Sequence, residues 1–307
     1  MIVVTGGSGF IGTHLCGRLQ EGGYDVRILD ISPPKAGVKA EFVRASVLDA
    51  ARLTKMLEGA EGVVHLAALI DVAASVSDPF SDFSVNATGT MNVLEAARHA
   101  CVKKVAFASS AAVYGEPERL PVDEEHPTRP LSPYGASKLA AERYVLLYGS
   151  LYGMETTALR LFNVYGEGQN ASSPYSGVIT KFADAISEGR QPIIFGDGEQ
   201  TRDFVHVDDV CEAFVRAIDG QGCETPLNIA SGVETSVAEL LETMCGICGA
   251  DFSPTYMPER QGEIARSVAD IKLARKRIGY SPRMALSQGL REMLEAKTGP
   301  KSIFSPK

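Results

Sequence analysis

The sequence has no uninterrupted apolar stretch of about 18 residues, the length that a membrane-spanning helix needs. The longest candidate, residues 62–76, is interrupted by His65 and Asp71. The chain begins Met-Ile-Val-Val, with neither a basic segment nor a small-residue cleavage site. We therefore expect no membrane span and no secretion signal.

Cysteine and positive charge are also scarce. The 307 residues include six cysteines, which without an export signal predict reduced thiols in the cytoplasm. The one close pair, Cys245 and Cys248, lacks a second pair at zinc-site spacing, so we expect packing rather than a metal site. The 38 acidic residues exceed the 30 basic ones, giving a formal charge of −8. This excludes the positive surface of a nucleic-acid-binding protein, and an anionic ligand needs a local site.

The composition itself, 45% hydrophobic and 22% charged, is that of an ordinary globular protein. The first half alternates short apolar strands with helical segments. We expect strands at residues 2–5, 24–30, 41–44, 62–66, 104–109 and 155–161, and helices at 10–21, 49–57, 82–99 and 133–151. Alternation of this length predicts a parallel sheet with helices on both faces.

The second half is less regular. Gly, Ser, Asn and Pro cluster at residues 166–177, which is typical of a loop. We expect helices at 176–188, 208–218, 236–248 and 286–295, and strands at 192–195 and 226–229, the last returning to the main sheet. The chain from residue 297 is expected to be loose. Because no clean linker separates the halves, we expect a second domain interleaved with the first.

The first expected strand runs directly into a glycine-rich turn that contains Gly6, Gly9 and Gly12. The first glycine permits a tight turn, the second lets the backbone approach a pyrophosphate, and the third allows close packing of helix on strand. The helix N-terminus then faces the anion. The pattern alone is weak, but here it opens a βαβ unit, which favours a dinucleotide site over an unliganded turn.

Asp30 ends the second expected strand, 18 residues beyond Gly12. At that position a carboxylate accepts the hydroxyls of an adenosine ribose and repels a 2′-phosphate, which favours NAD over NADP. The alternative is that Asp30 only caps the next turn.

A candidate catalytic group lies at the start of a later helix. Tyr134 and Lys138 are four residues apart and share one helix face. A phenol has a pKa of about 10, and a nearby ammonium group stabilises its phenolate and makes it a usable base. Ser110 follows the strand at 104–109, at the sheet edge where such folds bind ligands. It can hydrogen-bond the oxygen that Tyr134 deprotonates.

Several motifs together resemble the extended short-chain dehydrogenase/reductase family. They are Gly-Gly-x-Gly-x-x-Gly, Ser-Ser-Ala-Ala-Val-Tyr-Gly from residue 109, Tyr-Gly-x-Ser-Lys from residue 134, and Leu-Arg-Leu-Phe-Asn-Val-Tyr-Gly from residue 159. Within that family the chain most resembles the nucleoside-diphosphate-sugar epimerases of the UDP-glucose (UDP-galactose) 4-epimerase type, over nearly its whole length. The resemblance implies a Rossmann-type doubly wound sheet with a smaller, interleaved C-terminal α/β domain that binds substrate.

The resemblance also implies roles for matching residues. Tyr134 would be the base, Lys138 the ribose ligand and modulator of the phenol pKa, and Ser110 the hydrogen-bonding partner. The implied cofactor-binding residues are Gly6, Gly9, Phe10, Ile11, Gly12, Asp30, Val47, Leu66, Ala67, Ala68, Leu69, Asn86, Ser109, Tyr134, Lys138 and Phe162. The implied substrate-binding residues are Ser110, Tyr134, Asn163, Val178, Phe195, Arg202, Arg260 and Glu263. Among these, Asn163, Arg202 and Arg260 would hold the diphosphate and Glu263 its ribose. Outside this context a surface salt bridge would explain each arginine.

The chain departs from the family pattern at three places. Ser46 stands where relatives often carry Asp beside the adenine. Ala111 and Ala112 replace the Asp-Glu pair that serves water elimination in the 4,6-dehydratases, which argues against dehydration. Ser267 is small where relatives carry a large residue that narrows the sugar pocket, so an N-acetyl group would fit.

The resemblance implies reversible C4 epimerisation of a UDP-sugar through a transient 4-keto intermediate, with NAD as the cofactor. Other substrates stay open (UDP-N-acetylglucosamine and UDP-glucuronate), as do a UDP-glucuronate decarboxylase, another sugar-nucleotide dehydratase, and a non-catalytic NAD-binding sensor or scaffold. We expect residues 1–163 and about 203–231 to bind NAD, and 164–202 and about 232–307 to bind the sugar nucleotide. A homodimer is expected; the apolar stripe at 82–99 fits either its interface or the core.

Overall fold

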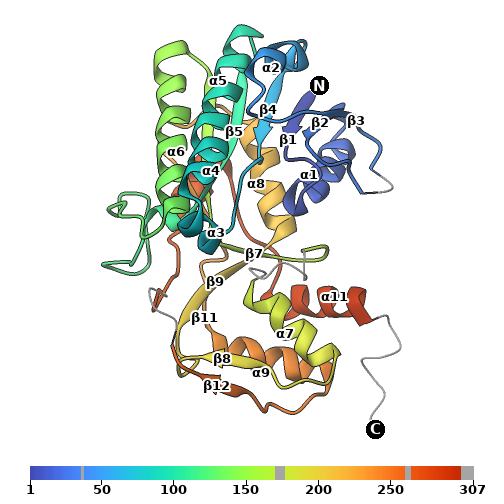
Figure 1. Ribbon diagram of the computed structural model, residues 1–307, viewed down its shortest axis with the longest axis vertical. Coiled ribbons are helices and arrows are strands. Elements are labelled where there is room, and N and C mark those ends of the chain that lie inside the picture. The colour runs from blue at the N-terminus through green and yellow to red at the C-terminus, as the bar shows by residue number, and fades with distance from the viewer. Residues whose placement is uncertain (36–37, 170–176, 260–263, 299–307) are drawn as a thin grey trace.

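The computed structural model describes residues 1–35, 38–169, 177–259 and 264–298 (Figure 1). Its centre is a seven-stranded sheet in the order β10-β6-β5-β4-β1-β2-β3, in which every neighbouring pair is parallel. The strands are β1 (Ile2–Thr5), β2 (Val26–Asp30), β3 (Glu41–Arg44), β4 (Gly62–His65), β5 (Lys104–Ser110), β6 (Glu155–Leu161) and β10 (Leu227–Ile229). The strand order reverses direction between β1 and β4, and in open parallel sheets ligands bind in the crevice at such a point.

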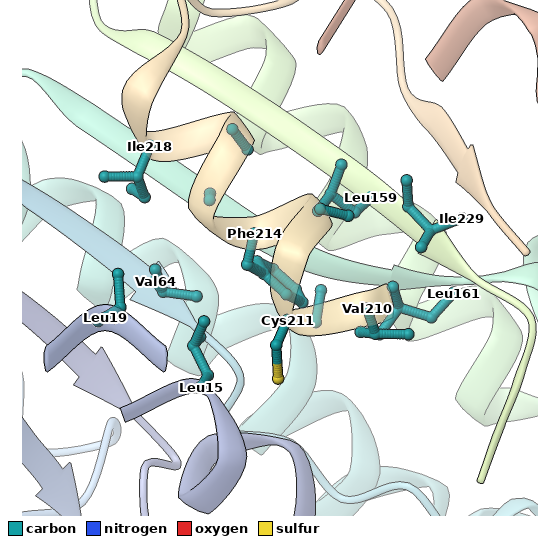
Figure 2. Close-up of a cluster of buried hydrophobic side chains, with 14 of the residues drawn as sticks. Leu15, Leu19, Val64, Leu159, Leu161, Val210, Cys211, Phe214, Ile218 and Ile229 are labelled. Atoms are coloured by element: carbon teal, nitrogen blue, oxygen red, sulfur yellow. The ribbon is translucent and has the colours of Figure 1, made fainter. Parts of the chain in front are cut away.

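Helices cover both faces of this sheet because its strands are apolar on both sides. One face carries α1 (Phe10–Glu21), α8 (Val207–Asp219) and α10 (Lys272–Ile278), and the other carries α2 (Ala50–Leu57), α5 (Gly89–His99) and α6 (Pro133–Tyr152). Figure 2 shows how the first face is filled: α8 places its apolar side among residues of α1 and the sheet, namely Val210, Cys211, Phe214, Ile218, Leu15, Leu19, Val64, Leu159, Leu161 and Ile229.

A smaller group of elements lies below the main sheet in Figure 1. It contains a three-stranded sheet of β7 (Asn163–Tyr165), β9 (Thr201–His206) and β11 (Glu234–Ser236), and a two-stranded sheet of β8 (Ile193–Phe195) and β12 (Thr255–Met257). Helices α7 (Val178–Ser187), α9 (Val237–Cys248) and α11 (Leu286–Thr298) pack here around a separate apolar cluster. Cys245 is buried in that cluster, so it packs as expected.

The chain between β4 and α5 is built from short helical pieces. Helix α3 (Val72–Ser77) and helix α4 (Pro79–Phe83) are each capped by an aspartate, Asp71 and Asp78. A π-helical turn (Ser84–Thr88) then joins α4 to α5. π-turns inside helices are rare and occur often at functional sites.

The elements predicted in the first half are confirmed, and most of their ends lie within two residues of the predicted positions. The strand expected at 226–229 does return to the main sheet, where β10 pairs with β6. The helix expected at 82–99 begins earlier and contains the π-turn. The expectation of a loose chain from residue 297 was wrong for its first two residues, because α11 extends to Thr298; residues 170–176 of the expected loop lie outside the described residues.

Sequence analysis did not predict α3, α10, β7, β9, β11 or β12. All six are three to seven residues long, too short to show a period. Among the helices that the structure describes, none combines the length and apolarity of a membrane span.

Candidate active site

The turn between β1 and α1 is shaped by the three predicted glycines. Gly6 has a φ of +69°, and a Cβ there would lie 2.6 Å from the backbone nitrogen of Ala67. A Cβ on Gly12 would lie 2.4 Å from the carbonyl oxygen of Gly6. Gly9 is the N-cap of α1 and has no capping side chain. The first amides of α1 therefore face a bare backbone cradle at the sheet crevice, which suits a pyrophosphate.

Asp30 lies beside this turn at the end of β2. One carboxylate oxygen accepts a hydrogen bond from the amide of Ser8 at 3.0 Å, and the other from the amide of Ser32 at 3.0 Å. The turn-capping alternative is thus present in the structure. Each carboxylate oxygen accepts more than one hydrogen bond, so the ribose role stays compatible with this geometry.

The segment after β4 borders the same crevice and contains four predicted cofactor residues, Leu66, Ala67, Ala68 and Leu69. The side-chain amide of Asn86 clamps it: its oxygen accepts from the amide of Leu69 at 2.8 Å, and its NH2 group donates to the Leu69 carbonyl at 2.9 Å. Asn86 therefore holds the groove-forming backbone. Val47 is buried against Gly89 of α5. A Cβ on Gly89 would lie 2.6 Å from a Val47 methyl group.

The predicted catalytic residues lie together at the carboxyl end of the sheet. Ser110 ends β5, and Tyr134 lies in the first turn of α6, which Ser132 caps by accepting from the amide of Gly135 at 3.1 Å. A cavity of about 230 Å³ is lined by both residues. It is also lined by the predicted Phe162, Asn163 and Arg202, and by Ala111, Ala112 and Ser267.

Burial is the largest influence on the pKa values of the predicted catalytic pair. Burial raises the pKa of the Tyr134 phenol, Asp82 raises it further, and a hydrogen bond with the Ser110 side chain lowers it. Burial lowers the pKa of the Lys138 ammonium to about 7, although the carboxylates of Asp82 and Glu142 oppose this. The Lys138 Nζ atom lies 4.3 Å from the centre of the Phe107 ring, a cation–π contact that supports the charged form.

Sequence analysis missed a set of buried polar residues directly behind these groups. Glu142 and Arg160 form an ion pair at 2.7 Å, and Glu142 also accepts from the predicted cofactor residue Ser109 at 2.6 Å. Ser109 thus anchors the end of β5 to α6. One signal was available: Arg160 stands between Leu159 and Leu161 inside a strand, and an internal charge of that kind predicts a buried partner.

Four other predicted substrate residues, Asn163, Val178, Phe195 and Arg202, lie in the smaller group of elements. The Arg202 Nη1 atom donates to the carbonyl oxygens of Thr201 and Ile264, both at 2.7 Å. The Asn163 side chain donates to the carbonyl of Asp203 at 3.3 Å. Phe195 ends β8 and Val178 begins α7; neither is among the residues that line the 230 Å³ cavity. Arg260 and Glu263 lie outside the described residues.

A glycine cradle at the crevice of a parallel sheet, with a serine at a strand end and a Tyr–Lys pair on the adjoining helix, defines a Rossmann-type dinucleotide-dependent enzyme. The model of the NAD dependent epimerase/dehydratase family matches residues 2–230, and the chain belongs to this family.

Similar proteins agree with this assignment. The chain is 42% identical to the UDP-glucose 4-epimerase of Mycolicibacterium smegmatis, over 95% of this chain and 97% of that protein. The crystal structure of the Thermotoga maritima UDP-glucose 4-epimerase with UDP-glucose superposes with a TM-score of 0.91 at 36% identity, covering 96% and 97% of the two chains. The structure of the UDP-N-acetylglucosamine 4-epimerase from Methanobrevibacter ruminantium, in complex with UDP-N-acetylmuramic acid, superposes with a TM-score of 0.90 at 35% identity, covering 96% of both chains. These structures confirm the Rossmann-type fold.

Proposed function

We propose that this protein catalyses the reversible epimerisation of a UDP-sugar at C4, of the UDP-glucose/UDP-galactose type, with NAD as a tightly held cofactor. The observation that carries the proposal is that Ser110 and Tyr134 line one cavity at the carboxyl edge of the sheet, with Lys138 one turn along α6. The 42% identity to a UDP-glucose 4-epimerase, over almost the full length of both chains, supports the same activity.

The residues of the cradle fit the cofactor. The close approach of Gly6 to Ala67, and of Gly12 to Gly6, requires residues without side chains and packs the turn tightly at the N-terminus of α1, where a pyrophosphate would lie. When bound, NAD supplies a hydride acceptor that returns the hydride to the opposite face of the sugar. Asp30 would hold the adenosine ribose and Phe162 would border the nicotinamide.

The protein's own groups move the proton. The Tyr134 oxygen, as phenolate, takes the proton of the C4 hydroxyl as the C4 hydride leaves, and gives it back when the hydride returns. Ser110 holds the same substrate oxygen by a hydrogen bond. The Lys138 ammonium stabilises the phenolate electrostatically. Hydride and proton both return to the sugar, so the reaction has no net redox change.

Asn163 and Arg202, with Val178 and Phe195, are the residues that we propose hold the uridine diphosphate, together with Arg260 and Glu263. A guanidinium group pairs with phosphate in a bidentate geometry, and it supplies locally the positive charge that the acidic chain lacks overall. Residues 1–163 and about 203–231 would form the NAD-binding domain, and 164–202 with about 232–307 the nucleotide-sugar-binding domain.

A UDP-N-acetylhexosamine is the second candidate substrate. Ser267 lines the cavity, and its short side chain leaves space beside the sugar. Ala111 and Ala112 line the same cavity and carry no acid for water elimination, which disfavours a dehydratase. A non-catalytic sensor would have no use for Ser110, Tyr134 and Lys138 placed together.

We further propose a cytoplasmic homodimer. All six cysteines are free thiols, as the reducing cytoplasm maintains. Helix α6 exposes an apolar row, Tyr144, Leu147 and Leu151, of which Leu151 is 62% exposed. A second copy placed against this face would bury it. The mass measured by light scattering should be twice that of the chain, and Leu147→Glu should halve it.

The activity is tested by a product assay without added cofactor. Purified protein is incubated separately with UDP-glucose, UDP-N-acetylglucosamine and UDP-glucuronate, and the products are resolved by mass and retention. An isomer of unchanged mass supports epimerisation, shows that NAD is carried by the protein, and identifies the sugar. Loss of carbon dioxide or of water indicates a decarboxylase or a dehydratase. No product from any of the three, also after NAD is added, contradicts the proposal.

A further inference from the structure

Asp82 is a buried carboxylate that the proposed reaction does not use. It lies on α4 and its residue is 1% exposed. One carboxylate oxygen accepts from the Ser137 hydroxyl at 2.5 Å, and the other from the Asn86 side-chain amide at 2.9 Å. Both donors are neutral, and in the part of the chain that the structure describes no ion pair includes Asp82.

The two donors connect Asp82 to both halves of the site. Ser137 lies between Tyr134 and Lys138 in the first turns of α6, and its hydroxyl is 3.0 Å from the Tyr134 carbonyl oxygen. Asn86 clamps Leu69 in the proposed cofactor groove. Asp82 therefore fixes the catalytic helix against the segment that would border NAD.

The other groups that face Lys138 do not supply an unpaired negative charge. On β5 its neighbour is the uncharged Phe107 ring. On β4 it is His65, which burial keeps neutral by lowering the imidazole pKa to about 3. On α6 it is Glu142, whose charge is matched by Arg160 of β6 through bonds of 2.7 and 2.9 Å.

We propose that Asp82 is a positioning residue for the catalytic pair: its carboxylate, held by Ser137 and Asn86, is the counter-charge that keeps Lys138 an ammonium ion beside Tyr134. The inference rests on the roles proposed above for Tyr134 and Lys138. It adds that the charge of this pair is controlled from α4, by a residue that touches neither sugar nor cofactor.

The negative charge of Asp82 shifts the pKa values of Tyr134 and Lys138 in the same direction. It favours the ammonium form of Lys138 and disfavours the phenolate form of Tyr134, so it raises the pKa of both groups. The active form has Tyr134 deprotonated and Lys138 protonated. Removal of the charge should thus move both the acid and the alkaline limb of the pH–rate profile to lower pH. A loss of packing alone would lower the rate and move neither limb.

The test is Asp82→Asn, which keeps the size of the side chain. Its oxygen can still accept from the Asn86 amide, and its NH2 group can donate to the Ser137 hydroxyl oxygen. We expect both limbs of the kcat profile to fall by about one pH unit, the low end of the pKa shift that one nearby charge produces. Ser137→Ala is the matched control. It removes one hydrogen bond to the same carboxylate and keeps the charge, so its kcat should fall while both limbs of its pH profile stay in place. Should Asp82→Asn not fold, as judged by circular dichroism, Asp82→Ser removes the same charge and the same shift is expected.

A second measurement separates this inference from the proposed activity. The phenolate absorbance of Tyr134 is titrated in NAD-loaded protein without sugar, by difference from Tyr134→Phe, in the wild-type and Asp82→Asn backgrounds. A lower pKa of Tyr134 in Asp82→Asn supports the role of Asp82 even if no sugar nucleotide is turned over. An equal or higher pKa, or pH limbs that stay in place, overturns it.

Discussion

Replacing Arg160 by methionine would remove the cation from an ion pair that the fold buries almost completely. The side chains of Arg160 and Glu142 are 2% and 0% exposed. Two guanidinium nitrogens donate to the Glu142 carboxylate, at 2.9 and 2.7 Å, and the guanidinium carbon lies 4.7 Å from the centre of the Tyr114 ring. Methionine fills much of the same volume, so the main change is electrostatic.

The stability lost in Arg160→Met comes from the Glu142 charge that stays buried. Without Arg160 the Glu142 carboxylate stays buried with the Ser109 hydroxyl as its remaining side-chain donor. Breaking a buried pair by removing one partner destabilises proteins by about 3–5 kcal/mol, because the other charge is uncompensated. Removing both charges, in Arg160→Met with Glu142→Met, should restore at least half of that loss, since no charge then stays buried.

Urea unfolding followed by circular dichroism measures these free energies. The matched control is Arg52→Met on α2, which breaks an exposed ion pair with Asp49 (59% and 37% exposed). It should cost less than about 1 kcal/mol. A loss below about 1 kcal/mol for Arg160→Met, or a double variant less stable than the single one, would refute the electrostatic reasoning.

Three further predictions concern the site. Gly12→Ala places a Cβ 2.4 Å from the Gly6 carbonyl oxygen. We expect it to lower the free energy of unfolding by about 1–3 kcal/mol and to abolish co-purification of NAD. The control Gly17→Ala lies on the same helix, where its Cβ meets nothing within 4 Å, and it should retain the cofactor. Tyr134→Phe should lower kcat by about 10²–10⁴-fold while UDP-glucose binding, measured by calorimetry, changes little; near-normal turnover would contradict its role as the base. Burial lowers the Lys138 pKa to about 7 in the folded protein. Between about pH 7 and pH 10 the unfolded chain therefore binds more protons than the folded protein, and stability rises with pH. Lys138→Met, compared with wild type by urea unfolding without NAD, should flatten that rise; parallel curves of stability against pH would exclude the burial effect.

The predicted part of the site depends on local patterns. The glycine turn after β1 and the spacing of Tyr134 and Lys138 are properties of a few consecutive residues, and the structure has them on one strand–helix junction and one helix. The first-half elements were predicted for the same reason. Each helix buries one face and shows it as a period in the sequence, and the strands, covered on both faces, show as short apolar runs. The ligand contacts of Asp30, Arg202 and the other site residues stay predictions.

Sequence alone therefore determined most of the strands and helices of the first half, the glycine turn after β1, and the placement of Tyr134 and Lys138 on one helix. Only the tertiary structure decided what surrounds them. Asp82 meets Ser137 across 55 positions of the chain, and Ser109 meets Glu142 across 33. Such contacts depend on how helices dock on the sheet, and no local period encodes them. The burial that moves the pKa values of Tyr134 and Lys138 has the same origin, because desolvation is a property of the packed protein and not of a segment.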